Sequence, residues 1–356
     1  MVISRRSREN PAVRNFLLRN LGDHPNDIAA VAAAKFGLSR NAINGYVNRL
    51  IDAGLLTGQG QTKARTYALK NIALHSSSPE IVPGLAEHDV WRKQIMPYIK
   101  DLPANIVDIC QYGFTEIFNN IVAHSGSAIS LIKYRQNYAS AEMTVADYGV
   151  GIFEKIQKDF GLPDSRSALL ELSKGRLTSD KANHSGEGIF FASRLFDRFS
   201  ITSGDLFYGL TMSGTGWLIE TRDLADYQPG TVVRMTIGTD VTRSVRDVFG
   251  RYTTKDLGFS RTHVLVCLGR YPGEQLLSRS QARRILSRVD RFAEAVLDFS
   301  GVSEIGQGAA DEIFRVFAAA HPGVKLLTAN ASPDVERSIA HVRGSGTRDA
   351  SGLGAL

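Results

Sequence analysis

The chain has 356 residues, of which 43% are hydrophobic and 22% are charged, a composition typical of a globular protein with enough apolar residues for buried cores. We expect no transmembrane helix, because no run reaches about 18 apolar residues, and no secretory signal, because no apolar segment follows the basic N-terminus. The two cysteines, Cys110 and Cys267, form no disulfide framework and match no metal-ligand spacing. The length predicts two or three domains, and the cytoplasm is the expected location.

The net charge of +6 is concentrated at one end of the chain. Residues 1–70 contain 11 basic and 4 acidic side chains, a net charge of +7, so the remaining 286 residues sum to −1. A local basic excess of this kind indicates an anionic partner for the N-terminal part rather than a generally basic protein.

Residues 10–70 predict three helices followed by a β-hairpin. PAVRNFLLRNL has helical apolar spacing after a proline, and DIAAVAAAKFG is a short helix that ends at Gly37. SRNAINGYVNRLIDAG predicts a helix with Ser39 as its N-cap, and it ends at Gly54. LLTGQGQTKARTYAL then predicts two strands joined by a glycine-containing turn.

This order resembles the winged helix-turn-helix family, which implies that the third helix reads DNA in the major groove. Arginine and asparagine pair bidentately with guanine and adenine edges, and basic side chains on the wing neutralise phosphates. The candidate DNA-binding residues are Arg40, Asn41, Asn44 and Asn48 on the helix and Lys63 and Arg65 on the wing. The alternative is that this module serves protein contacts or dimerisation. Residues 71–84, NIALHSSSPEIVPG, lack periodicity and are expected to be a short linker.

A polar stripe follows in the segment EIFNNIVAHS. Glu116, Asn120 and His124 are spaced i, i+4 and i+8, so a helix would place them on one side. Such a stripe is normally a solvated face. An acid and an amide one turn apart can also hold a hydrated cation and orient a water molecule, so the downstream motifs must decide between the two.

Three further motifs follow in order: Asp-x-Gly-x-Gly in MTVADYGVGI, Ser-Gly-x-Gly in HSGEGIFF and a strand that begins with Gly-Thr in GTVVRMTI. Each motif alone is weak, and SGEGI does not have the spacing of the dinucleotide-binding fingerprint. Their order, after E-x3-N-x3-H, resembles the GHKL ATPase domain of gyrase, heat-shock chaperones, histidine kinases and mismatch-repair ATPases. Within it, the anti-sigma-factor kinase branch is most similar. The resemblance covers residues 85–245 and implies bound ATP.

The residues of the stripe suit magnesium and phosphoryl chemistry. The amide oxygen of Asn120 is a hard neutral ligand suited to Mg²⁺, which keeps several waters and bridges phosphates. Glu116 can accept a proton from a nucleophile or orient it toward a γ-phosphate, and the resemblance implies this general-base role. Glu116 is therefore the candidate catalytic residue and Asn120 the candidate metal ligand. The resemblance implies only a structural or second-layer role for His124, and Asn119 is offset from the stripe.

The glycine motifs suit the nucleotide itself. The resemblance implies that Asp147 accepts a hydrogen bond from the adenine amine, while glycines beside it let the backbone pass close to the base. Glycines before a helix let backbone N–H groups hold phosphate oxygens. Besides Asn120, the candidate ATP-binding residues are Asp147, Gly149, Gly151, Ser185, Gly186, Gly188 and Thr231.

Residues 168–188 lie between these motifs, are polar, and contain glycine and serine. The resemblance places a mobile ATP lid here, in which Lys174, Arg176 and Lys181 could reach phosphates on closure. Lys174 is added to the candidate ATP-binding residues. The alternative is that these side chains are simply solvated.

Residues 258–343 alternate strand and helix and predict a small α/β domain. LDFSGVSEIGQGAADEIF resembles STAS domains, the fold of anti-sigma-factor antagonists. That resemblance implies a phosphorylatable serine at the start of the helix after the second strand, but the aligned residue is Gly308. This departure argues against phosphorylation of the chain by itself, although Ser300 and Ser303 lie nearby, and favours an interaction or dimerisation module. Residues 344–356 are Gly/Ser-rich and expected to be disordered.

The predicted fold class is thus a multidomain α/β protein. A winged helix (1–70) is followed by a GHKL-type α/β sandwich with a mixed sheet and by a small STAS-like α/β domain. The predicted function is a DNA-binding regulator that binds ATP and Mg²⁺, hydrolyses ATP slowly, and responds to its nucleotide state. One alternative is an anti-sigma-factor-type serine/threonine kinase acting on a separate STAS-like partner. Another is an ATP site that only stabilises the fold. No membrane partner is expected.

Overall fold

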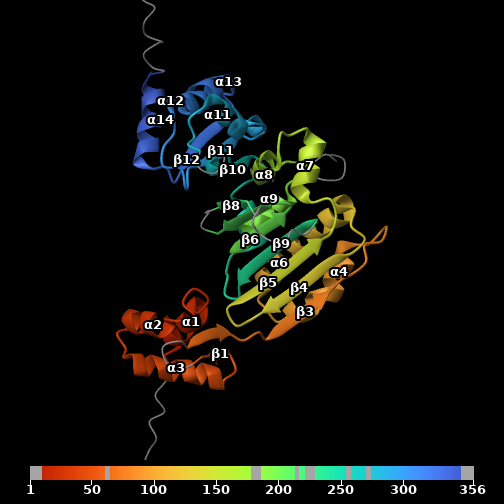
Figure 1. Cartoon of the computed structure of the whole chain (residues 1–356), viewed down its shortest axis with the longest axis vertical. Coiled ribbons are helices and arrows are strands. Elements are labelled where there is room, and N and C mark those ends of the chain that lie inside the picture. The colour runs from red at the N-terminus through yellow and green to blue at the C-terminus, as the bar shows by residue number, and fades with distance from the viewer. Residues whose placement is uncertain are drawn as a thin grey trace, which may run out of the picture.

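The computed structural model describes residues 10–60, 65–177, 186–212, 216–220, 229–253, 258–269 and 274–345. The chain forms three parts that follow one another along the sequence (Figure 1). A helical part with a two-stranded hairpin comes first, a seven-stranded sheet with helices second, and a three-stranded sheet with helices last. The coarse expectation of a multidomain α/β protein is confirmed.

The N-terminal part has the predicted element order. It consists of α1 (Pro11–Asn20), α2 (Ile28–Phe36), α3 (Arg40–Asp52), β1 (Leu56–Gln59) and β2 (Thr66–Leu69). The Ser39 side chain accepts a hydrogen bond from the Ala42 N–H at 3.2 Å and so caps α3 as predicted. Gly37 ends α2 with a φ of 64°, a left-handed conformation that favours glycine.

This part has a core of its own, formed by buried side chains of the three helices and β1. These are Val13, Leu17, Leu18, Leu21, Ile28, Ala32, Ile43, Val47, Leu50 and Leu56. Its contacts with the central part are surface interactions: Arg19 pairs with Asp240, and Arg198 lies 3.4 Å from Asp23. Exposed ion pairs contribute at most about 1 kcal/mol each. The interaction between the two parts is therefore weaker than the packing within either core.

The expected linker over residues 71–84 is partly wrong. Residues Ala73–Ser77 form β3, which pairs antiparallel with β4 (Ser130–Gln136) at the edge of the central sheet. An edge strand has one neighbour and one exposed side, so it needs no run of apolar residues. Its Ser-rich sequence therefore does not predict a strand. The chain passes from β2 to β3, and so into the central sheet, through a three-residue connection.

The central sheet has the strand order β3-β4-β5-β9-β6-β7-β8. Its other strands are β5 (Ser140–Asp147), β6 (Arg198–Ser203), β7 (Leu206–Thr211), β8 (Gly216–Glu220) and β9 (Thr231–Gly238). Every pairing among these strands is antiparallel, so the expected mixed sheet is a wrong prediction. The reason is that β9 inserts between β5 and β6 and runs opposite to both.

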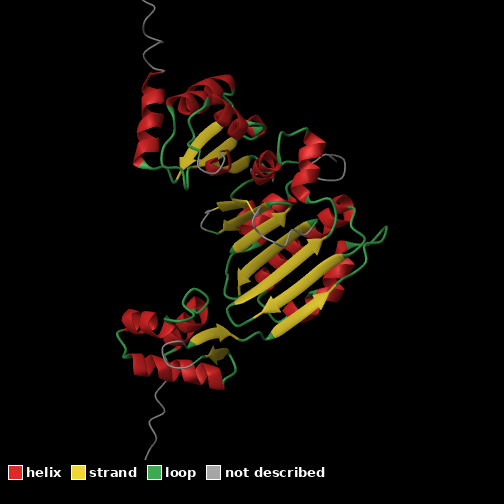
Figure 2. Cartoon of the chain, viewed as in Figure 1, coloured by secondary structure: helices red, strands yellow, loops and turns green. Residues whose placement is uncertain are grey.

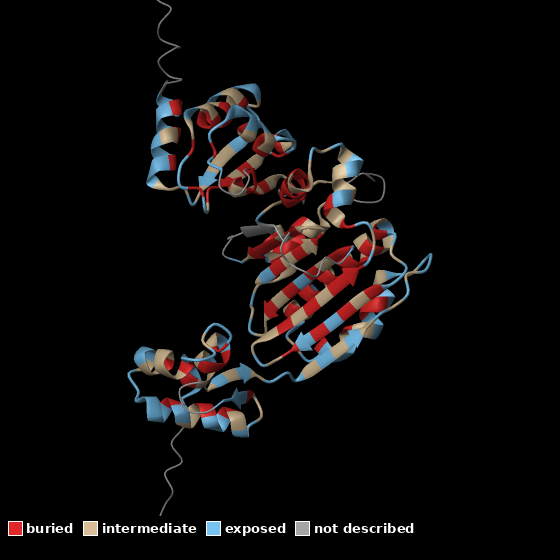
Figure 3. Ribbon diagram, in the orientation of Figure 1, coloured by how far each residue is buried: buried red, intermediate tan, exposed pale blue. Residues whose placement is uncertain are grey.

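Helices cover one face of this sheet, and the other face is open (Figure 2). The covering helices are α4 (Glu87–Gln94), α5 (Met96–Ile99), α6 (Ala104–Asn120), α9 (Gly188–Leu195) and α10 (Val245–Phe249). Burial alternates along β4 accordingly: Ile132 and Tyr134 are buried, whereas Lys133 and Arg135 are exposed (Figure 3). Such alternation is typical of an antiparallel sheet with one solvated face.

Two helices, α7 (Ile152–Phe160) and α8 (Ser165–Lys174), connect β5 to α9. The first part of the expected lid over residues 168–188 is therefore wrong, since every α8 residue from Ser167 to Lys174 is buried. Residues 178–185 of that expected lid lie outside the described residues.

The C-terminal part is the predicted small α/β layer. Its parallel sheet has the order β10 (Arg261–Leu265), β11 (Glu294–Asp298) and β12 (Lys325–Ala329). Its helical segments are α11 (Arg279–Leu286), α12 (Gln307–Asp311), a π-helical turn (Glu312–Phe317), α13 (Ala318–Ala320) and α14 (Pro333–Ser345). Of the tail, residues 346–356 lie outside the described residues.

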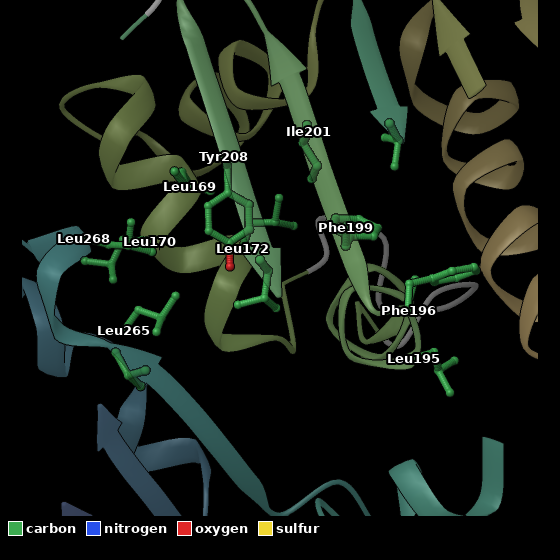
Figure 4. Packing of buried hydrophobic residues seen from close by; sticks show 14 of the residues in the cluster. Leu169, Leu170, Leu172, Leu195, Phe196, Phe199, Ile201, Tyr208, Leu265 and Leu268 are labelled. Carbon is green, nitrogen blue, oxygen red and sulfur yellow. The ribbon is translucent and has the colours of Figure 1, made fainter. Parts of the chain in front are cut away.

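The central and C-terminal parts share one continuous hydrophobic core. Leu169 and Leu170 of α8 lie beside Leu265 and Leu268 of the C-terminal part, and all four are at most 5% exposed (Figure 4). Helix α8 also contacts α7 and α9 of the central part. This helix therefore belongs to both parts, and its packing fixes the cavity described below relative to the C-terminal sheet.

Candidate functional site

A cavity of about 300 Å³ lies in the central part, between α6, α7, α8 and the strands β5 and β9. Its volume is at the lower end of the range of about 300–1,000 Å³ that is usual for small-molecule sites. Five separated segments supply its polar lining: the C-terminal end of α6, the end of β5, one face of α7, the start of α9 and the start of β9.

The polar stripe of α6 lines this cavity. Glu116, Asn120 and His124 all contribute to its wall, as does the neighbouring Asn119, and all four are only partly exposed. The backbone widens into a π-helical turn at Ile121–Ser125, so His124 follows the stripe through a wider turn than an α-helix has. The stripe is thus a cavity wall and not a fully solvated helix face.

The amide of Asn120 has a defined orientation. Its Nδ2 donates a hydrogen bond to the backbone oxygen of Glu116 at 2.8 Å. The nitrogen is thereby bound to the helix, which leaves Oδ1 as the side-chain atom that can coordinate a cation. This orientation suits the metal-ligand role expected from the sequence.

Asp147 and Thr231 lie together at another wall of the cavity. Asp147 is 4% exposed, and its Oδ1 accepts a hydrogen bond from the Gly149 N–H at 2.8 Å. Burial raises the pKa of Asp147, and backbone hydrogen bonds from Gly149 and Thr231 oppose that rise. The Thr231 hydroxyl accepts a hydrogen bond from the Ile152 N–H at 3.0 Å, which fixes the start of α7 beside β9.

The predicted glycines are sites of close backbone approach. A Cβ on Gly149 would stand 1.9 Å from the Ser125 carbonyl oxygen, so β5 can pass the end of α6 only without a side chain there. Gly151, Gly186 and Gly188 line the cavity, whereas Gly149 lies behind its wall. A Cβ on Gly188, the first residue of α9, would stand 1.9 Å from Oε2 of Glu116.

Lys174 requires a correction, because the structure turns it away from the cavity. Its ammonium group is 1% exposed and contacts the Glu171 carboxylate at 2.7 Å. It also donates hydrogen bonds to the backbone oxygens of Ser287 at 2.8 Å and Arg284 at 3.2 Å, both in the C-terminal part. The cause is tertiary: α8 is covered on this side by the C-terminal part, so a lysine that looks solvated in sequence becomes an interface residue.

Arg176 makes the same kind of contact. Its guanidinium donates hydrogen bonds to the backbone oxygens of Arg291, at 2.6 Å, and of Phe259, and lies over the ring of Phe292. Two of the three basic residues expected to reach phosphates thus bind the C-terminal part. Ser185 and Lys181, the other expected residues of this stretch, lie outside the described residues.

Two charged residues of the cavity were missed by sequence analysis. Lys155 and Asp159 of α7 both line it, and Lys155 Nζ lies 3.2 Å from Asp159 Oδ2. The available signal was the apolar face of α7, where Ile152 and Ile156 recur at helical spacing. Lys155 and Asp159 lie three and seven positions after Ile152, so they fall on the same side of the helix.

The candidate DNA-binding residues of α3 are together on one surface. Arg40, Asn41, Asn44 and Asn48 are all exposed, while Ile43 and Val47 on the opposite face are buried. On the hairpin, Arg65 is half-buried, with its guanidinium 5.3 Å from the centre of the Tyr67 ring. Lys63 lies outside the described residues.

In the C-terminal part, Gly308 lies in the first turn of α12. The carboxylate of Asp298 lies nearby in sequence at the end of β11 and is 1% exposed. Burial alone would raise its pKa, but the His263 ring nitrogen at 3.1 Å and hydrogen bonds from Asn330 and Ser300 outweigh it and hold the pKa well below the usual range. These contacts join β10, β11 and the residue after β12.

A family model described as a STAS-like domain of unknown function (DUF4325) matches residues 281–336 of the chain. The C-terminal part is therefore STAS-like, as expected from the sequence. No curated protein matches the chain. Within the described ranges, no helix has the length and apolar content needed to span a membrane. The same residues contain no cluster of three or more histidine, cysteine, aspartate or glutamate side chains placed to hold a metal.

Proposed function

We propose that the chain is an ATP-binding, DNA-binding regulator whose central cavity takes Mg-ATP and hydrolyses it slowly. The observation that carries this proposal is that Glu116, Asn120, Asp147, Gly188 and Thr231 come from four distant segments and meet at one cavity. Their order in the sequence resembles that of GHKL ATPases. A solvated helix face would not converge with two glycine motifs and a strand end.

The residues present suit this nucleotide. A buried carboxylate beside a strand end, Asp147, can accept a hydrogen bond from an exocyclic amine and so select adenine. The absence of a Cβ at Gly188 lets the Glu116 carboxylate approach the start of α9, where backbone N–H groups favour anions. A single amide ligand, Asn120, suits Mg²⁺, which is commonly held by few protein groups together with phosphates and water.

Each residue then has a defined task. Asn120 Oδ1 would hold the metal ion, which neutralises charge on the phosphate oxygens when it is bound. Glu116, one helical turn before it, would orient the attacking water and accept its proton. His124 and Asn119 extend the polar wall.

DNA binding is assigned to the N-terminal part. Three features support it. Positions 1–70 contain 11 basic residues against 4 acidic ones, and a hairpin lies beside α3. The exposed face of α3 carries Arg40, Asn41, Asn44 and Asn48. The STAS-like part would bind a protein partner or a second copy, and its rigid contact with α8 joins it to the cavity.

The deciding experiment incubates the purified full-length chain with Mg²⁺ and γ-labelled ATP and follows free phosphate and protein-bound label together. We expect slow release of free phosphate that is lost in Glu116→Ala. Label transferred to protein would identify a serine/threonine kinase instead. No binding of ATP at any Mg²⁺ concentration would overturn the proposed function.

A further inference from the structure

Helix α7 presents one face to the cavity. Ile152, Lys155, Ile156 and Asp159 all line it, at the i, i+3, i+4 and i+7 spacing of one helical face. Among the lining residues of the described chain, Lys155 is the one lysine or arginine. The cavity also holds the carboxylates of Glu116, Asp147 and Asp159, so its described charged side chains are mainly acidic.

We propose that Lys155 is the residue that binds the polyphosphate of the nucleotide and that Asp159 is its counter-ion before the nucleotide binds. The proposal rests on the proposed function, because it requires ATP to enter this cavity. It assigns to α7 the role that sequence analysis gave to Lys174, which is buried against the C-terminal part.

The position of Lys155 along the cavity agrees with this role. Helix α7 begins at Ile152, whose N–H donates to Thr231 beside the buried Asp147, the wall assigned to adenine. Lys155 is one turn farther, about 4.5 Å along the helix axis, and Asp159 lies about 6 Å beyond Lys155. A nucleotide bound with its base at Asp147 can therefore extend its phosphates toward the flexible side chain of Lys155.

The electrostatics of the cavity give the counter-ion its role. The Lys155 and Asp159 side chains are 35% and 26% exposed, so the ammonium group can leave Asp159 for an anion without crossing a buried interface. An anion entering a cavity with three carboxylates is repelled unless a cation meets it. Lys155 supplies that cation, and Asp159 competes with phosphate for the Lys155 ammonium group.

The same helix offers a matched control. Lys158 pairs with Glu154 at 2.5 Å, also at i, i+4 spacing, but these side chains are 67% and 51% exposed and do not line the cavity. Loss of either lysine removes one positive charge and one helix-surface ion pair. Only the loss of Lys155 should weaken binding of the polyphosphate.

The test is calorimetric titration of the full chain with Mg-ATP, ADP and adenosine. We expect Lys155→Ala to weaken ATP binding about tenfold or more, as for loss of a charge-assisted hydrogen bond, and to leave adenosine binding unchanged. Lys155→Arg should restore most of the ATP affinity, and Asp159→Asn should raise it. Lys158→Ala should leave both ligands unaffected.

The outcomes separate the two proposals. Unchanged ATP affinity in Lys155→Ala, in a protein whose wild type binds ATP, overturns the inference and leaves the proposed function standing. Equal losses of ATP and adenosine assign Lys155 to folding of α7 and also overturn it. An ATP affinity that is unchanged in Asp159→Asn removes the counter-ion role. A wild type that binds neither ATP nor adenosine overturns the proposed function and the inference together.

Discussion

The carboxylate of Glu116 lies against Gly188, so closely that a Cβ on the glycine would stand 1.9 Å from Glu116 Oε2. Helix α6 carries the acid and helix α9 begins with the glycine, so the two helices meet at the candidate catalytic group. A real Cβ is essentially never nearer than 3.0 Å to a non-bonded heavy atom of a residue elsewhere in the chain, so this contact excludes a side chain at position 188 unless Glu116 moves.

The first prediction concerns this contact. Gly188→Ala should displace the flexible end of the Glu116 side chain and lower the free energy of unfolding by no more than about 1 kcal/mol, the lower end of the cost of overpacking. Glu116→Ala should remove most of that penalty, because it deletes the group that the new methyl meets. Urea unfolding of both single variants and the double variant measures the coupling. Additive effects of the two changes would show that the helices do not meet here.

The second prediction separates binding from turnover. Glu116→Gln keeps the size of the side chain but not its basicity, so ATP affinity should persist while phosphate release falls by about 10²-fold or more. Asn120→Ala should instead abolish the Mg²⁺ dependence of binding, because it removes the proposed metal ligand. Measured affinities with Mg²⁺ and with chelator decide this, and wild-type turnover in Glu116→Gln would remove the general-base assignment.

The third prediction follows from the raised pKa of Asp147. Burial disfavours its ionised form in the folded state, so this residue favours folding at low pH and that contribution is lost as pH rises above the ordinary carboxyl value of about 4. Asp147→Asn does not titrate and can still accept the Gly149 hydrogen bond. The stability of the wild type relative to this variant should therefore fall with rising pH in that window, which thermal melts at several pH values measure. A flat difference would contradict the burial of the carboxylate. Selectivity for adenine over guanine nucleotides should weaken in the same variant.

The fourth prediction concerns the buried pair of Lys174 and Glu171. Lys174→Ala leaves the Glu171 carboxylate buried with Arg288 at 3.8 Å as its remaining basic neighbour, and should cost about 3–5 kcal/mol. Replacing both residues, as in Glu171→Leu with Lys174→Met, should cost much less, because no buried charge is left without a partner. Lys158→Ala, at an exposed pair, is the control and should change stability little. If Lys174→Ala is as mild as that control, the ammonium group is not buried in solution.

The fifth prediction tests the DNA-binding surface. Arg40→Ala combined with Asn44→Ala should abolish specific retention of a duplex selected by the wild type, because both side chains reach from the exposed face of α3. Arg135→Ala, on the exposed face of the central sheet, removes one arginine elsewhere and serves as the control. A gel shift unchanged in the double variant would remove α3 as the recognition helix.

The sequence predicted those elements that have local causes. The cap at Ser39, the stop at Gly37 and the alternating strands and helices of the C-terminal part follow from nearby residues, and the structure agrees. The polar stripe was predicted because Glu116 and Asn120 are one helical turn apart. Their direction toward a cavity follows from the same period once Phe114 and Phe118 are buried on the opposite side.

What the sequence could not show depends on distant parts of the chain. The strand β3 is defined by its pairing with β4, and its own residues favour a loop. Lys174 is buried because Glu171 and two carbonyl oxygens of the C-terminal part surround its ammonium group. Lys155 looked like any lysine of an amphipathic helix, and only the packing of α7 turns it toward the cavity.

The helix shared by the central and C-terminal parts limits how this protein can be divided or recombined. A cut before β10, at the boundary expected from sequence, would expose Leu169 and Leu170 on one fragment and Leu265 and Leu268 on the other. Each fragment would then carry an apolar surface that favours aggregation. A gene fusion that transplants the STAS-like part onto another protein must therefore bring a substitute for α8 with it.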